Sequence, residues 1–223
     1  FYNLFLDNTM IYSSGLFKNK KDTLEDSQKQ KVDTLISKLN IKENDHVLEI
    51  GSGWGYTALT LAQKYKCKVT TITLSHEQKK YTEELIKKNN CDHLITVKIE
   101  DYRTVKGEFD AIISIEMIEA VGHKYLSNYF EVCNNRLKKN GVLAIQAITY
   151  PDKYYKHYNN GTDFIRKHIF PGGHLPSLEI IKKIISKHTQ LDEFNKLNIA
   201  QSYATTLTHW RDSLLSKKDQ LYK

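Results

Sequence analysis

The sequence predicts an α/β fold in which a doubly wound, parallel, Rossmann-like sheet carries a helical insertion after its fifth strand. Two observations lead to this prediction. Short apolar segments rich in β-branched residues alternate with amphipathic segments of helical length over residues 46–149. Three glycines, Gly51, Gly53 and Gly55, directly follow the first apolar segment, where such a sheet places a ligand-binding turn.

The elements are expected in the following order. Residues 23–39 begin with a Thr followed by acidic residues and place apolar residues at helical spacing, which predicts an amphipathic helix. Apolar and β-branched runs predict five strands, over residues 46–50, 67–74, 94–101, 109–116 and 142–149. Three further helices are expected, over residues 56–65, 75–90 with Ser75 as N-cap, and 123–138, with a turn at 139–141.

The alternation of strands and helices ends after Thr149. The next segment contains all three prolines and a Pro-Gly-Gly turn, and it is rich in aromatic and basic residues, which is typical of an insertion over a sheet. The pattern resumes with residues 191–200. We expect a single domain over residues 1–223 with four parts: an N-terminal helical part (1–40), the core (41–149), the insertion (150–186) and a return to the core (187–223).

The composition is ordinary for a globular protein, with 40% hydrophobic and 26% charged residues. No apolar run approaches the roughly 20 residues that a membrane-spanning helix needs. Cys67, Cys91 and Cys133 form neither a CxxC pair nor a metal-binding pattern, which favours reduced thiols in a cytosolic protein without a metal site. The net charge of +7 favours an anionic partner, yet no concentrated block of Lys and Arg indicates nucleic acid, and we expect none.

The glycine turn suits a ligand that must approach bare backbone. Backbone N–H groups beside a helix N-terminus can meet a polar ligand there. The spacing is G-x-G-x-G, because Tyr56 stands where dinucleotide-binding proteins place a third glycine. Glu49, two residues before the first glycine, suits a cationic ligand better than a pyrophosphate. The amino group and sulfonium of S-adenosylmethionine fit this description; a turn that only reverses the chain is the alternative.

The acidic residue that usually holds ribose hydroxyls after the second strand is missing, since that strand ends in Thr-Ile-Thr-Leu-Ser. Glu77 and Gln78, in the first turn of the next helix, are expected to take its place. Asp101, after the third strand, is placed to accept a hydrogen bond from an adenine amino group, with Tyr102 covering the ring. A helix or turn cap is the alternative interpretation of Asp101.

Several segments in fixed order carry a family resemblance, and IFPGGHLPS (169–177) with EMIEAVG (116–122) is the most specific pair. With them, the chain resembles the cyclopropane-fatty-acyl-phospholipid synthase family of methyltransferases across nearly its whole length. The matching segments are residues 11–17, 23–41, 47–59, 73–78, 100–103, 109–130, 146–155, 163–178 and 203–210. The family's chain continues beyond residue 223, so the resemblance implies a truncated copy.

The resemblance implies a Rossmann-like methyltransferase fold, in which the insertion covers the substrate, together with two groups of site residues. S-adenosylmethionine is implied to be held by Tyr12, Ser13, Gly51, Gly53, Gly55, Thr73, Leu74, Ser75, Gln78, Asp101 and Tyr102. A bicarbonate ion, the family's catalytic base, is implied to be held by Ser14, Glu119, Gln146, Ile148 and Tyr203. Ser14 and Gln146 stand where the best-known pattern has Cys and His, and Ala120 stands where His usually follows Glu119.

The implied reaction is methyl transfer to the double bond of an unsaturated phospholipid acyl chain, with ring closure to a cyclopropane. The carbocation that forms needs a dry pocket with aromatic faces. The insertion offers such rings in Tyr154, Tyr155, Tyr158, Phe164 and Phe170. A base must then remove a proton from the added methyl group.

Other interpretations stay open for these residues and for the function. Glu119 is alternatively a helix cap and Tyr203 a core residue, while His123 and His174 are interpreted as loop residues without an acid–base partner. Methyl transfer without ring closure, or to a small amine, is the alternative within the same cofactor class. A non-catalytic module that binds nucleotide or membrane is the alternative of another class.

The last third of the chain carries most of the excess positive charge. Residues 151–223 contain 12 Lys and Arg against 7 Asp and Glu. Because basic surfaces bind anionic lipid headgroups, we expect a cytoplasmic protein that contacts the inner membrane surface peripherally. An oligomer is compatible with the sequence.

Overall fold

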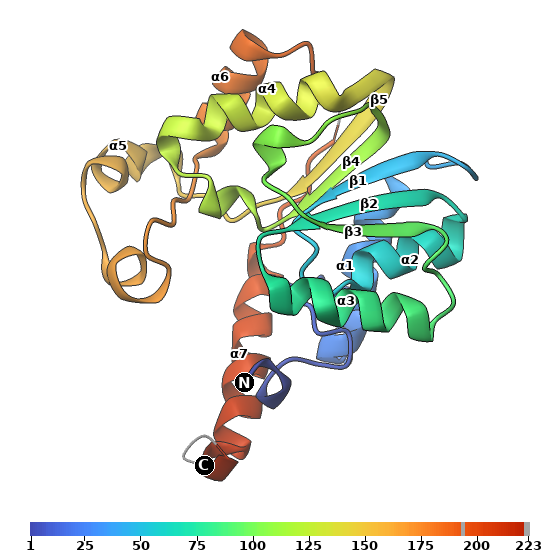
Figure 1. Ribbon diagram of the computed structural model, residues 1–223. Helices are drawn as coiled ribbons and strands as arrows, with labels where there is room; N and C mark the ends of the chain where they lie inside the picture. The colour runs from blue at the N-terminus through green and yellow to red at the C-terminus, as the bar shows by residue number, and fades with distance from the viewer. Residues whose placement is uncertain (193–194, 221–223) are drawn as a thin grey trace.

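The computed structural model describes residues 1–192 and 195–220. At its centre lies a five-stranded parallel sheet with the strand order β3-β2-β1-β4-β5 (Figure 1). The strands are β1 (His46–Ile50), β2 (Lys68–Thr73), β3 (Ile95–Ile99), β4 (Phe109–Ile115) and β5 (Leu137–Gln146). The strand order reverses between β1 and β4, which confirms the predicted doubly wound fold.

Helices cover both faces of the sheet (Figure 1). One face carries α1 (Leu24–Ser37), α2 (Tyr56–Tyr65) and α3 (His76–Lys88), and the other carries α4 (Leu126–Arg136) and α6 (Leu178–His188). Successive side chains of β1 point to opposite faces of the sheet. Val47 packs with the first group of helices and Leu48 with the second, so the sheet has a hydrophobic core on each face. Both side chains are fully buried.

Two further α-helices lie outside these layers: α5 (Asp152–Asn160) in the insertion and α7 (Ala200–Ser216) near the N-terminal segment (Figure 1). A five-residue π-helix, η5 (Ile165–Ile169), follows α5. The 3₁₀ turns are η1 (Tyr2–Leu4), η2 (Tyr102–Thr104), η3 (Ile118–Ala120), η4 (His123–Tyr125) and η6 (Lys218–Gln220). No helix in the two described ranges has both the length and the apolar character needed to cross a membrane.

The fifth strand differs from its prediction. The sequence predicts a helix to residue 138, a turn at 139–141 and a strand over 142–149, but α4 ends at Arg136 and β5 begins immediately after it. The expected turn is a bulge inside the strand. Phe109 pairs with Leu137 and Ala111 with Val142, so β5 carries extra residues between these pairs, and Asn140 takes a φ of 65°. β5 ends opposite the last residue of β4.

The other core elements lie close to their predicted positions. β1 and α2 have the predicted bounds. The predicted N-cap of α3 is confirmed, because the Ser75 hydroxyl accepts a hydrogen bond from the backbone N–H of Gln78 at 3.2 Å. The three cysteines are buried free thiols.

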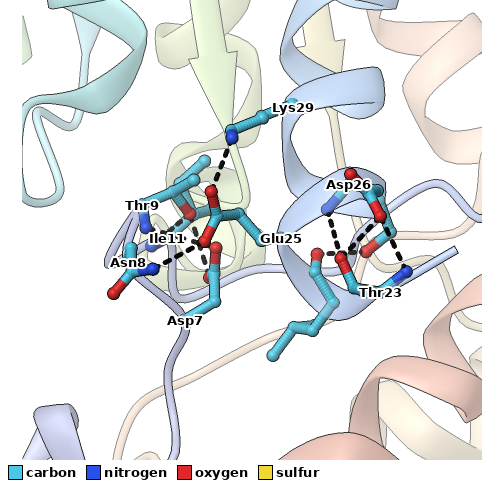
Figure 2. Close-up of polar contacts among 10 residues, drawn as sticks. Asp7, Asn8, Thr9, Ile11, Thr23, Glu25, Asp26 and Lys29 are labelled. Atoms are coloured by element: carbon cyan, nitrogen blue, oxygen red, sulfur yellow. Dashed lines mark hydrogen bonds and ion pairs between the residues drawn. The ribbon is translucent and has the colours of Figure 1, made fainter.

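The N-terminal segment is tied to the start of α1, as Figure 2 shows. Thr23 and Asp26 cap this helix reciprocally, each side chain accepting from the other's backbone N–H. Asn8 donates to the Glu25 carboxylate at 2.8 Å. These contacts fix the segment that leads into Tyr12 and Ser13.

α7 holds the same segment from the other side. The Thr206 hydroxyl accepts from the backbone N–H of Gly15 at 3.0 Å, and the Ser202 hydroxyl accepts from that of Phe17 at 3.1 Å. Trp210 of α7 packs in a small core with apolar residues of the N-terminal segment. Residues 13–17 are therefore held between two helices far apart in sequence.

The insertion forms a lobe beside the sheet (Figure 1). α5 and the π-helix make up this lobe, whereas α6 returns to the sheet and packs on α4 through a row of isoleucines. The row consists of Ile180, Ile181, Ile184 and Ile185. The division of the domain into four parts stays a prediction.

Candidate functional site

A cavity of about 660 Å³ opens beside the carboxyl ends of the strands, where the strand order reverses between β1 and β4. Eleven of the twelve residues predicted to bind the cofactor line it. They are Tyr12, Ser13, Glu49, Gly51, Gly53, Thr73, Leu74, Ser75, Gln78, Asp101 and Tyr102. The structure thus gathers these residues from four parts of the chain around one site, and their contacts with a cofactor stay a prediction.

The glycine turn uses its glycines in different ways. The backbone N–H groups of Gly51 and Gly55 are not free for a ligand, because they donate to Ile72 and Ser52. At Gly53, which has a φ of 48°, an added Cβ would meet no atom within 4 Å. Gly55 lies outside the cavity lining, and its missing side chain lets α2 approach α3, since a Cβ there would lie 2.7 Å from Thr82.

Glu49 is a buried carboxylate in the cavity wall. Its side chain is held by the Thr71 hydroxyl, which donates to Oε2 at 2.6 Å. Burial raises the pKa of Glu49 to about 8. No Lys or Arg among the described residues pairs with it within ion-pair distance. A cationic group that enters the cavity would provide the missing countercharge.

The Thr73–Gln78 region is ordered by its own hydrogen bonds. The Thr73 hydroxyl donates to the Gln78 side-chain oxygen at 2.7 Å, which leaves the amide NH₂ of Gln78 as a donor at the cavity. Glu77 lies outside the cavity lining and accepts from the Ser75 hydroxyl instead. Of the two residues proposed to replace the ribose-binding acid, only Gln78 therefore faces the site. Glu100 at the end of β3 also lines the cavity.

Asp101 has a partner within the protein. Its carboxylate accepts from the backbone N–H of Arg103 at 2.9 Å, which caps η2, and from the Arg103 guanidinium at 2.5 Å. The Arg103 side-chain hydrogen bond holds the pKa of Asp101 below its usual value. Tyr102 packs edge-on against the buried Tyr129, which fixes its ring at the cavity. The cap expected as the alternative is therefore present, and Asp101 lines the cavity as well.

The aromatic residues that line the cavity come from outside the insertion. The cavity is lined by the rings of Tyr2, Tyr12, Trp54, Tyr56, Tyr102 and Tyr125. None of the five insertion aromatics lines it. Tyr154, Phe164 and Phe170 are more than half exposed, and Tyr155 and Tyr158 are buried inside the insertion lobe. The insertion follows β5, whose end lies beside this cavity, but its rings face solvent or each other.

A second group of predicted residues lies around Glu116, which lines the same cavity. Glu116 Oε1 accepts from the backbone N–H of Ser14 at 2.9 Å and from the side-chain amide of Gln146 at 2.8 Å. The same amide also donates to the Ser14 carbonyl at 3.1 Å. The donors on which a bicarbonate ion was expected to bind are thus already engaged by a carboxylate of the chain.

Glu119 lies near enough to Glu116 for their charges to interact, and it is partly buried. Its Oε1 accepts from the backbone N–H of Ile148 at 2.6 Å, while its buried Oε2 has no partner among the described residues. Burial raises the pKa of Glu119 to about 7. Burial also raises the pKa of Tyr203 to about 12, with the charges of Glu116 and Glu119 adding to the effect. The other four predicted residues therefore gather around the Glu116 and Glu119 carboxylates.

His123 and His174 are not the unpartnered loop residues of the sequence prediction. The Tyr155 hydroxyl joins them, at 2.7 Å from His123 Nδ1 and 2.8 Å from His174 Nε2. Burial lowers the pKa of His174 to about 4. The backbone N–H of His174 donates to the Glu119 carbonyl at 2.8 Å, so the Pro-Gly-Gly-His turn is fastened next to Glu119. The correction arises because the partner, Tyr155, comes from α5.

Glu116 and Lys31 have no role in the sequence prediction. The position of Glu116 at the carboxyl end of the fourth predicted strand is a signal that could have identified it. The sequence does not indicate that Glu116 takes a positive backbone φ of 46°, a conformation that ends the extended strand. Lys31 lies on a predicted amphipathic helix, where a lysine ordinarily belongs to the solvated face.

The sheet order and the cavity at its switch point define a Rossmann-like fold of the S-adenosylmethionine-dependent methyltransferase class. A family model described as mycolic acid cyclopropane synthetase matches residues 1–223. The chain belongs to this family.

Relatives and solved structures agree with this assignment. The chain is 34% identical to the tuberculostearic acid methyltransferase UfaA1 of Mycobacterium tuberculosis, over 97% of this chain and 52% of that protein. It is also 34% identical to the cyclopropane-fatty-acyl-phospholipid synthase of Escherichia coli, over 96% of this chain and 53% of that protein. The chain thus spans about half the length of these relatives.

The fold matches that of the mycolic acid cyclopropane synthase CmaA1, solved in complex with S-adenosylhomocysteine and the detergent CTAB. The TM-score is 0.90 at 28% identity, over 98% of this chain and 80% of that one.

Proposed function

We propose that this chain is the catalytic part of an enzyme that transfers a methyl group from S-adenosylmethionine to the double bond of an unsaturated phospholipid acyl chain. Ring closure to a cyclopropane is the product we expect. The observation that carries the proposal is a single cavity with a buried, unpaired Glu49 on one wall and the Glu116 carboxylate on another. Two relatives are named as a methyltransferase that makes a fatty acid and a synthase of cyclopropane fatty acyl phospholipids, and these names support the substrate class.

The cavity suits S-adenosylmethionine in size and charge. Its volume of about 660 Å³ is within the range of small-molecule sites. Glu49 would hold the ammonium of the amino-acid part, and the open space above Gly53 would admit the ligand backbone. Gln78 offers its amide NH₂ as a donor, and Tyr102 offers a ring face beside Asp101. When bound, the cofactor supplies an electrophilic methyl group.

The residues of the chain would supply the base. Removing a proton from the methylated acyl chain requires an acceptor close to the reacting carbon. Glu116 faces the cavity and is oriented by Ser14 and Gln146, so we propose that its carboxylate takes this proton. A bicarbonate ion beside Glu119 and Tyr203 is the competing proposal, and the buried, unpartnered Oε2 of Glu119 is the group that such an ion would meet.

Ser14 and Gln146 hold the Glu116 carboxylate in one place by their hydrogen bonds, and a base fixed in this way allows a second product. If the base removes a proton from a neighbouring carbon, and not from the added methyl group, the acyl chain keeps a double bond and gains a branch. The position of Glu116 decides which proton is nearest. Methyl transfer without ring closure is therefore the second candidate function.

Lipid analysis tests the proposal and separates the two products. In cells that express the full-length protein containing this chain, we expect unsaturated acyl chains to gain the mass of one CH₂ group. A cyclopropane resists the catalytic hydrogenation that saturates a branched alkene. Cells with the Glu49→Gln variant serve as the matched control. An unchanged lipid profile, from a protein that binds S-adenosylmethionine, would overturn the acyl-chain substrate and favour a small amine.

We further propose that the insertion lobe touches the membrane surface. Its tip exposes Phe164, Ile165, Ile169 and Phe170, each more than half accessible. The same lobe also exposes three lysines: Lys153, Lys156 and Lys167. A lobe that exposes both apolar and basic residues suits an anionic lipid surface, to which each lysine adds about 1 kcal/mol of attraction.

Vesicle sedimentation measures this contact. Replacing the three lobe lysines by Gln should weaken binding to anionic vesicles by about 150-fold, because three lysines at about 1 kcal/mol each contribute about 3 kcal/mol. Replacing three exposed lysines of α3, Lys80, Lys87 and Lys88, is the matched control and should change binding little. Binding of the unaltered protein should also weaken with salt. Equal binding to neutral vesicles would contradict the electrostatic contact.

A further inference from the structure

Lys31 is a buried cation at the back of the cavity wall. Its side chain projects from α1 and the residue is 2% exposed; it is the one buried residue among the described lysines and arginines. Its Nζ lies 2.5 Å from the Ser13 hydroxyl oxygen. No carboxylate of the described residues lies within ion-pair distance of Lys31, although Asp7 and Glu116 are near enough to act on its charge. A buried ammonium without a paired anion is costly, so its presence calls for an explanation.

Ser13 is held from behind by two residues on one face of α1. Gln28 donates to the Ser13 carbonyl at 2.8 Å, and Lys31 donates to the Ser13 hydroxyl. Residues three apart on a helix lie on the same face, so the two contacts work together. The carbonyl and the hydroxyl oxygen of Ser13 therefore both accept hydrogen bonds from α1.

The ammonium fixes how the Ser13 hydroxyl is presented. An ammonium only donates, so the hydroxyl oxygen must accept from it, and the hydroxyl hydrogen must point elsewhere. That hydrogen has no acceptor among the described residues, and Ser13 lines the cavity. Ser13 is thus a donor polarised by a positive charge and aimed at a ligand. Such a donor suits an anionic acceptor.

The other charges in the wall indicate which part of the ligand this acceptor is. Glu100, Asp101 and Glu116 line the cavity, and Arg103, which also lines it, is paired with Asp101, so the wall would repel a free anion. A zwitterion avoids this conflict, because its ammonium can meet Glu49 while its carboxylate meets Ser13. The amino-acid part of S-adenosylmethionine is such a zwitterion.

We propose that Lys31 is a positioning residue that acts through the Ser13 hydroxyl to hold the carboxylate of the cofactor's amino-acid part. This inference rests on the proposed function, because it assigns one end of the same cofactor. The competing explanation is that Lys31 only fastens α1 to the loop at residue 13. If Lys31 only fastens the loop, replacing it should lower the affinity of every ligand of the cavity equally. If it acts on the carboxylate, only ligands that carry a carboxylate should bind more weakly.

The test compares two ligands that differ in the carboxylate. Calorimetry would measure the affinities of S-adenosylmethionine and of decarboxylated S-adenosylmethionine for the wild type and for Lys31→Met, which keeps the length of the side chain. We expect Lys31→Met to weaken S-adenosylmethionine binding by about 10- to 100-fold, the range for a hydrogen bond to a charged group. The affinity for the decarboxylated ligand should change by less than about threefold, within the scatter of independent sites.

Ser13→Ala provides a second variant in case Lys31→Met does not fold. It should show the same selective loss, and the double variant should lose little more than either single one, because both residues act on one contact. Equal losses for the two ligands, or no loss, would overturn the inference while leaving the proposed function standing. If the wild-type protein bound neither ligand, the proposed function would fail first.

Discussion

Replacing Glu49 by Gln is expected to make the ligand-free protein more stable at pH 8 and to weaken cofactor binding about 100-fold. Burial raises the pKa of Glu49 from 4.5 to about 8, so between these values the folded state holds a proton that the unfolded state has released. The wild-type free energy of unfolding therefore falls as pH rises from about 4.5 to about 8. Gln carries no such penalty, and it also lacks the charge that would bind the ammonium of the ligand.

Chemical unfolding of both proteins over this pH range, together with calorimetry, would measure the two effects. The stability difference should be near zero at pH 4.5 and grow to on the order of 3–5 kcal/mol at pH 8, since each unit of pKa shift corresponds to about 1.4 kcal/mol. Glu43→Gln, at an exposed position just before β1, is the control and should change neither quantity. A Glu49→Gln protein that binds S-adenosylmethionine normally would remove Glu49 from the proposed site.

Replacing Glu116 by Gln is expected to reduce turnover by about 10²- to 10⁴-fold while changing cofactor affinity little. The amide oxygen of Gln can still accept from Ser14 and Gln146, so the local hydrogen bonds survive. The substitution removes only the ability to take a proton. Single-turnover measurements with S-adenosylmethionine and vesicles of unsaturated phospholipid would separate the chemical step from binding.

Bicarbonate depletion decides between the two proposed bases. If Glu116 takes the proton, wild-type turnover should not respond when bicarbonate is removed and then restored. Glu108→Gln, at an exposed position before β4, is the control for loss of a carboxylate and should retain full turnover. Turnover that requires bicarbonate, with Glu116→Gln near wild type, would assign the base to an ion held beside Glu119 and Tyr203.

The fold could be predicted because its signals are local. β1 and α2 follow directly from an apolar run, three glycines and a helical period, and the structure places them as predicted. The boundary between α4 and β5 could not be predicted, because Asn140 and Gly141 form a turn sequence that the sheet accommodates as a bulge. The pairs that Leu137 and Val142 make with β4, on either side of the bulge, are long-range contacts that the local sequence does not indicate.

The candidate site was predictable to the extent that strand ends carry it. Glu49 near the end of β1, Gly53 in the turn after it and Gln78 in the first turn of α3 follow from their positions, and all three line the cavity. Two features escape local patterns. The Gln146 amide donates to Glu116 only because the backbone at Glu116 brings that carboxylate close to it. Lys31 is buried only because the loop at Ser13 folds over α1. Both features arise from tertiary packing, which produces no periodic pattern in the sequence.

The grip of α7 on the loop at Gly15 has a consequence for how the protein is made. Gly15 and Thr206 are separated by 191 residues, and Phe17 and Ser202 by 185. A ribosome delivers the five strands long before it delivers α7, so a growing chain can assemble its sheet while the wall that contains Tyr12 and Ser13 still lacks one of its two supports. Contacts this distant in sequence close late, because the loop entropy they require must be overcome first. The ligand pocket is therefore completed only once α7 has been made, after the scaffold beneath it.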